Sequence, residues 1–203
     1  MKKILKFTAF TALVLFLFFL GTLLADKYAL RNNVIRLHVV ANSDNNADQR
    51  IKMAVKDAVV AYIMDEIPNP KNAYEAKALL SERLCDIQSI ADEVLAAKGS
   101  SDCAIVTLCK ETYGIREYET FSLPSGIYES LRVEIGDAKG KNWWCVVFPS
   151  LCAPKTCDAF VEAAVSSGLD PMLVDTLAEN DTFEVRFYLL DLIGKIEKFF
   201  SFS

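Results

Sequence analysis

The side chains best suited to chemistry in this sequence are a single histidine, His38, and six cysteines. A nucleophile paired with an imidazole base would have to use His38. This histidine lies in a run of branched apolar residues typical of a strand, and no recognised nucleophile or zinc-protease motif surrounds it. We interpret His38 as a strand residue with one structural hydrogen bond. A thiol-dependent hydrolase that uses Cys145 with His38 is the alternative.

The cysteines do not have the spacing of a metal site. No C-x-x-C pair occurs, whereas structural zinc sites usually take paired thiolates at short spacing. We predict no metal and no cofactor. Outside the cytoplasm the cysteines could form disulfides, but their positions alone do not choose among the many possible pairings. The six are Cys85, Cys103, Cys109, Cys145, Cys152 and Cys157.

Two further features could suggest chemistry, and each has a simpler interpretation. The loop at residues 136–142 holds Gly136 and Gly140, but it joins two predicted strands, so no helix N-terminus would face an anion. We predict a hairpin connection there. Carboxylate pairs such as Asp65 with Glu66 are expected on the solvated surface of an acidic protein. The sequence therefore predicts no catalytic residue.

The segment after this loop carries the adjacent tryptophans Trp143 and Trp144. Neighbouring residues of a strand point to opposite faces of the sheet. Either both rings are buried between packed layers, or one is an exposed aromatic anchor of the kind that dominates protein–protein interfaces.

The elements that position these residues follow from the periodicity of the chain. Residues 34–41 form a nearly continuous apolar run, which predicts a strand in the centre of a sheet. Helices are predicted from Ile51 to Ile63 and over residues 74–97, and Asn42, Ser43 and Asp44 have side chains suited to capping the first. Further strands are predicted at residues 103–109, 115–120, 131–135, 143–148 and 183–189, with a short helix at 155–165. This order predicts an α+β fold, with a mostly antiparallel sheet and helices packed on one face.

The N-terminal segment predicts passage into or across a membrane. Lys2, Lys3 and Lys6 precede residues 7–25, which carry no charge and would span roughly 28 Å as a helix. The lysines favour the cytoplasmic side and place the rest of the chain outside. Residues 1–25 are therefore a signal peptide or an uncleaved signal anchor. Residues 26–203 are predicted to be one extracytoplasmic domain that begins with a short polar link at residues 26–33.

The charge of the chain excludes some partners. The net charge is −5, and the acidic excess is larger once the lysine-rich start is set aside. Such a surface is unsuited to nucleic acid and to adhesion to anionic lipid. We expect neither nucleic acid nor a small-molecule substrate as a partner.

Three stretches carry a family resemblance. They are residues 34–44 (V-I-R-L-H-V-V-A-N-S-D), residues 131–136 leading through G-K-N-W-W-C-V-V-F-P to Leu151 and Cys152, and residues 183–187 (F-E-V-R-F). In this order, behind an export segment, they resemble stage II sporulation protein R of endospore-forming bacteria.

The resemblance implies a signal between compartments. Proteins of this family are exported from the forespore into the space between the forespore and mother-cell membranes. There they activate an aspartic protease embedded in the mother-cell membrane, which processes the sigma-E precursor. The resemblance also implies a disulfide between Cys145 and Cys152, with two separate buried thiols as the alternative. The hydrolase described above and a structural envelope protein are the alternative functions.

The expected contact surface for the protease lies in the two longest matching strings. Its predicted residues are Trp143, Trp144, Lys141, Asn142, Asn42, Ser43 and Asp44. We expect no catalytic residue in this chain, because the peptide-bond chemistry belongs to the protease.

Overall fold

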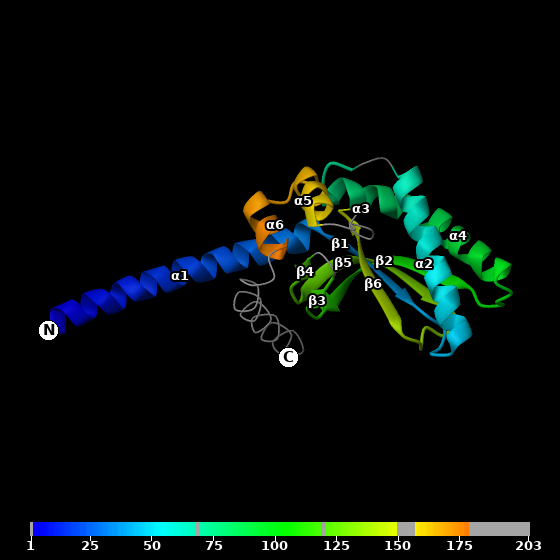
Figure 1. The fold of residues 1–203 in the computed structure, drawn as a ribbon, viewed down its shortest axis with the longest axis horizontal. Coiled ribbons are helices and arrows are strands. Elements are labelled where there is room, and N and C mark those ends of the chain that lie inside the picture. The colour runs from blue at the N-terminus through cyan, green and yellow to red at the C-terminus, as the bar shows by residue number, and fades with distance from the viewer. Residues whose placement is uncertain (1, 68–69, 119–120, 150–156, 179–203) are drawn as a thin grey trace.

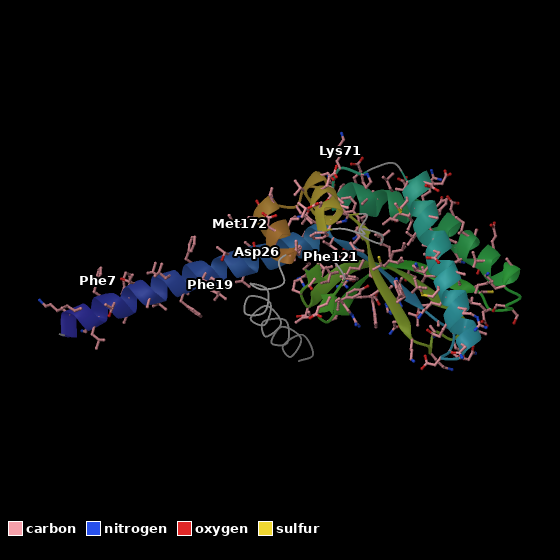
Figure 2. The ribbon with its side chains drawn as sticks, viewed as in Figure 1. Phe7, Phe19, Asp26, Lys71, Phe121 and Met172 are labelled. Atoms are coloured by element: carbon pink, nitrogen blue, oxygen red, sulfur yellow. The ribbon has the colours of Figure 1, made fainter. Side chains whose placement is uncertain are left out.

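A long apolar helix leads directly into a mixed β-sheet. The computed structural model describes residues 2–67, 70–118, 121–149 and 157–178. Helix α1 (Lys2–Asn33) extends away from the other elements and continues, after one residue, into strand β1 (Ile35–Val40), as Figure 1 shows. Phe7 and Phe19 project from the free part of this helix, with no other described element around them (Figure 2). By length and composition, α1 is able to cross a membrane.

Four strands form the main sheet in the order β2-β5-β1-β6. Strand β1 pairs in parallel with β5 (Gly126–Ile135) and antiparallel with β6 (Asn142–Phe148), while β2 (Ala104–Tyr113) pairs antiparallel with β5. The fold class is α+β with a mostly antiparallel sheet, as predicted. The predicted central position of residues 34–41 is confirmed.

Three helices cover one face of this sheet. Helices α2 (Asn46–Glu66), α3 (Ala73–Glu82) and α4 (Leu84–Ala97) pack against the alternate strand residues that point toward them. Leu37, Val39 and Leu131 are fully buried at the centre of this core. The period-two alternation of β1 and β5 thus supplies one apolar face, and the helical stripes cover it.

A smaller apolar cluster lies beyond the opposite face. Helices α5 (Cys157–Ser166) and α6 (Pro171–Ala178) pack there with the end of α1 and with the hairpin of β3 (Arg116–Glu117) and β4 (Ser122–Leu123). Leu30 of α1 and Phe160 of α5 are buried in it, and Phe160 stacks on Phe121 with ring centroids 4.5 Å apart. The predicted strand at residues 183–189 lies outside the described residues.

Two predicted helical boundaries are wrong. Residues 26–33 form the last turns of α1 instead of a polar link, because Leu30 is buried and ties this part of the helix to the domain. The helix predicted over residues 74–97 divides at Arg83 into α3 and α4. The division lets α3 approach α1 while α4 packs on α2 and β2, and a single straight helix could not reach both surfaces.

The pairing of the strands differs at one predicted turn. Strand β2 pairs with β5, and the short β3–β4 hairpin lies between them in sequence. The loop at residues 136–142 is not a hairpin connection, because β1 lies between the two strands that it joins. Periodicity identified these strands but carried no information about which strands are neighbours.

Candidate partner-binding corner

The loop between β5 and β6 crosses the end of β1 and bonds to its backbone. The backbone N–H of Gly140 donates to the carbonyl oxygen of Ala41 at 2.8 Å, and that of Lys139 donates to Asn42 at 3.1 Å. A Cβ atom on Gly140 would overlap the carbonyl oxygen of Ser43, so this close crossing requires glycine. We call residues 41–45 together with residues 136–143 the corner.

The side chains of residues 42–44 hold the corner together. The amide oxygen of Asn42 accepts a hydrogen bond from the backbone N–H of Asp137 at 2.9 Å, and Asp44 accepts one from Lys141 at 2.7 Å. The Ser43 hydroxyl donates to Asp48 at 2.7 Å, and this bond lowers the pKa of that carboxyl. The side chain that caps α2 is Asn45, which accepts from the backbone of Asp48, and not the predicted Asn42–Asp44 group.

A buried lysine supports the corner from below. The Lys52 ammonium donates to the Gln49 side chain at 2.7 Å and to the carbonyl oxygen of Lys141 at 2.9 Å. Burial lowers the pKa of Lys52 because water no longer solvates its charged form. The amine therefore ties the β5–β6 loop to α2.

The two tryptophans point to opposite faces, as predicted. Trp143 is 37% exposed, and the Lys56 ammonium of α2 lies 5.2 Å from its ring centroid. Trp144 faces the other way and stacks on His38 with ring centroids 5.6 Å apart. The guanidinium of Arg116 lies 3.7 Å from the Trp144 ring centroid on this face. One ring is thus an exposed aromatic at the sheet edge, and the other is held within a layer of side chains.

The face that carries Trp144 holds an ionic network. The Nδ1 atom of His38 lies 3.1 Å from the Glu111 carboxylate, and Arg132 bridges Glu111 at 2.9 Å and Glu134 at 2.7 Å. Burial alone would raise the pKa of Glu111. The hydrogen bonds and positive charge around it outweigh burial and lower that pKa to about 2. We call His38, Glu111, Arg132 and Glu134 the polar face.

Next to the polar face lies the buried cation Arg36. Its guanidinium carbon lies 4.0 Å from the ring centroid of Tyr113 and 5.2 Å from that of Tyr128, and its Nη2 donates to the Tyr118 hydroxyl at 2.6 Å. Aromatic faces therefore take the place of water around this charge. Arg36 anchors the β3–β4 hairpin to the centre of the sheet.

The structure does not bring Cys145 and His38 together, as the alternative thiol-dependent hydrolase would require. His38 lies on the polar face, whereas Cys145 points into the helical core and is held in a disulfide. Its predicted partner, Cys152, lies outside the described residues, so the pairing Cys145–Cys152 stays a prediction. Cys85, Cys103 and Cys109 are free thiols. No cluster of possible metal ligands occurs in the part of the chain that the structure describes.

The structure brings most of the predicted contact residues into the corner. Asn42, Ser43 and Asp44 lie against the β5–β6 loop, but their polar groups largely serve hydrogen bonds within the corner. Lys141, Asn142 and Trp143 are exposed, whereas Trp144 is half-buried on the opposite face. Contact of any of these residues with a partner stays a prediction.

Sequence reasoning missed the polar face and the support below the corner. The alternation of β1 places Arg36 and His38 on one face, and the alternation of β5 places Arg132 and Glu134 on one face. The sequence of each strand therefore indicates which of its own polar side chains lie together. The strand order that joins them to Glu111 could not be inferred from that alternation. Nothing in the sequence indicates that Lys52 is buried, because a lysine on a helix normally faces water.

The comparisons with known proteins agree with the first two matching stretches, residues 34–44 and the stretch from residue 131 to Cys152. The family model for stage II sporulation protein R matches residues 31–157. A curated relative, stage II sporulation protein R of Bacillus subtilis (strain 168), is 29% identical over 183 residues, which cover 81% of this chain and 82% of the relative. No solved structure matches the chain. The matched region runs from the end of α1 through the sheet and the corner, and the chain therefore belongs to the stage II sporulation protein R family.

Proposed function

We propose that this chain is an exported signal of endospore formation that activates a membrane-embedded aspartic protease in the opposing membrane. The protease then removes the pro-sequence of the sigma-E precursor. Membership of the sporulation family supports this role, and α1 is suited to export or anchoring. The chain acts by contact, and the chemistry belongs to the protease.

The observation that carries the proposal is the exposed aromatic at a rigid corner. Trp143 is 37% exposed at the edge strand, next to the exposed residues Lys141 and Asn142. The backbone beneath it is fixed by the hydrogen bonds that join the loop to the end of β1. A preorganised aromatic of this kind loses little conformational entropy on binding, which favours its use as an interface anchor.

The position of the corner also supports the proposal. Strand β1 begins one residue after α1 and runs away from it, so the corner lies at the far end of the strand. Figure 1 shows α1 entering the domain at one end and the connection from β1 to α2 at the opposite end. A domain attached through α1 would present the corner to a partner across the intermembrane space.

The test is processing of the sigma-E precursor in a bacterium that does not sporulate and that expresses the precursor, the protease and this chain. Trp143→Ala should lower the processed fraction by roughly thirtyfold at limiting expression, because truncation of an interface anchor typically costs at least about 2 kcal/mol. Its melting temperature should change little, since the ring is part-exposed. Met64→Ala is the matched control, because Met64 is an exposed apolar residue on α2 away from the corner.

Three results would contradict the proposal. Full processing by Trp143→Ala would exclude the corner as the contact site, and unfolding of that variant would show that the ring belongs to the core. Processing without any expressed chain would remove the need for an activator.

A further inference from the structure

A pocket with basic walls lies where α1 joins the domain. It has a volume of about 310 Å³ and is enclosed by the end of α1, the start of α3 and strands β2 and β5. Its charged side chains are Arg31, Lys77, Lys110 and Glu129. Val34 and Ile127 contribute apolar wall, and Tyr74 stands at its rim with 85% of its surface exposed.

The charge of this pocket is opposite to that of the whole chain. Lys77 forms an ion pair with Glu129 at 2.8 Å, and the Lys110 ammonium lies 3.9 Å from the same carboxylate oxygen. One carboxylate thus faces three cations, and Arg31 has no ion-pair partner among the described residues. The pocket is left with an excess of positive charge in a protein whose net charge is −5. Such a site favours an anion.

The pocket also lies at a defined height above the apolar part of α1. Arg31 follows the last uncharged residue of that part, Ala25, by six positions of unbroken helix, which corresponds to about 9 Å. The headgroup region of a bilayer extends roughly 5–8 Å beyond the hydrocarbon. If α1 spans the membrane, the backbone of Arg31 lies just above this region, and its side chain, which in a helix tilts toward the N-terminus, reaches back to the level of the lipid phosphates. Tyrosine side chains such as Tyr74 and Tyr28 are well suited to this boundary.

We propose that this pocket binds the phosphate group of an anionic phospholipid in the outer leaflet of the membrane that α1 crosses. Arg31, Lys77 and Lys110 contact the phosphate, and Val34 and Ile127 form apolar wall beside it. Together with α1, the bound lipid fixes the tilt of the domain on the membrane. The corner, at the other end of β1, then points away from that membrane.

The test uses the full chain reconstituted in vesicles of phosphatidylcholine, with or without one quarter phosphatidylglycerol. A membrane-impermeant amine reagent modifies exposed lysines, and mass spectrometry gives the rate at each position. Modification of Lys77 and Lys110 should slow by roughly fivefold with phosphatidylglycerol, the size expected for one basic side chain near an anionic surface. The exposed Lys98, at the end of α4, should react at an unchanged rate.

Matched variants separate the pocket from general charge attraction. In Arg31→Gln the protection of Lys77 and Lys110 should fall, whereas Arg50→Gln removes an exposed charge on α2 and should leave protection intact. Glu129→Gln should increase protection, because it removes the carboxylate that competes with the phosphate. Circular dichroism of each variant establishes that the domain is folded.

Three outcomes would overturn the proposal. Equal slowing at Lys98 would show a surface-potential effect without a site. Equal protection by soluble glycerol phosphate in phosphatidylcholine vesicles would show that the pocket binds small anions and not lipid. Unchanged modification of Lys77 and Lys110 in a chain that remains in the membrane would show that the pocket takes no lipid, and this result would leave the activator role unaffected.

Discussion

Single residues of this protein show how a strand can serve two environments. In β1 the apolar side chains of Leu37 and Val39 enter the helical core, while Arg36 and His38 point to the other face. The charges on that face are stabilised by aromatic rings and by the carboxylates of Glu111 and Glu134. Because Glu111 joins strand β2 to both β5 and β1, it is the residue on which the polar face depends most.

Replacement of Glu111 by glutamine should lower the free energy of unfolding by about 2 kcal/mol at neutral pH, because His38 and Arg132 lose a charged partner. The folded pKa of about 2 lies below the ordinary value of 4.5. The carboxylate therefore contributes stability above pH 4.5, and this contribution is lost as the pH falls toward 2. Denaturant unfolding between pH 7 and pH 2 should show a shallower decline for Glu111→Gln than for the unaltered chain.

The exposed Glu93 on α4 provides the control for this measurement. Glu93→Gln makes the same chemical change without a polar-face contact, so its pH dependence should match that of the unaltered chain. Parallel curves for Glu111→Gln and the unaltered chain would contradict the assigned role of Glu111.

Among the elements, the β5–β6 loop decides the arrangement of the sheet edge. It passes over the end of β1 and places β6 on the far side of that strand, where β6 is the outermost of the described strands. The crossing depends on a close backbone approach at Gly140 and on the amine of Lys52 beneath the loop. The corner is thus a structural joint as well as the proposed contact surface.

Gly140→Ala should lower the free energy of unfolding by about 2 kcal/mol, because the new methyl group would meet the Ser43 carbonyl and force the loop to move. Gly114→Ala is the matched control, since a Cβ atom there meets nothing within 4 Å. Thermal unfolding of both variants gives the comparison. A stable Gly140→Ala variant would show that the crossing tolerates more space than the structure provides.

In the molecule as a whole, α1 belongs both to the membrane segment and to the domain. Large apolar residues in its N-terminal part, such as Phe7 and Phe18, are exposed, whereas Leu30 is 1% exposed in the cluster formed with α5 and α6. Figure 2 shows Asp26 at the point where the helix reaches α6 and Met172. The domain is therefore joined to the helix without a flexible link, and any membrane that holds α1 also restricts the orientation of the domain.

Leu30→Ala should lower the free energy of unfolding of the full chain in detergent micelles by about 3 kcal/mol, as expected for a truncated core leucine. Leu24→Ala, at a position 44% exposed on the same helix, should leave the domain as stable as before. Denaturant titrations followed by tryptophan fluorescence provide the values. Equal stability of the two variants would show that the end of α1 is not part of the domain core.

The sequence by itself determined the fold class, the apolar N-terminal helix, the strands at residues 34–41, 131–135 and 143–148, and the opposite directions of Trp143 and Trp144. These follow from composition and from the two- and 3.6-residue periods, which are local properties of the chain. It also determined the family, because residues 34–44 and the string ending at Cys152 are long and distinctive. Only the tertiary structure decided the strand order, the burial of Arg36 and Lys52, the pairing of His38 with Glu111, and the docking of Leu30. Each of these depends on contacts between segments far apart in the sequence, and no local pattern specifies which distant segments become neighbours.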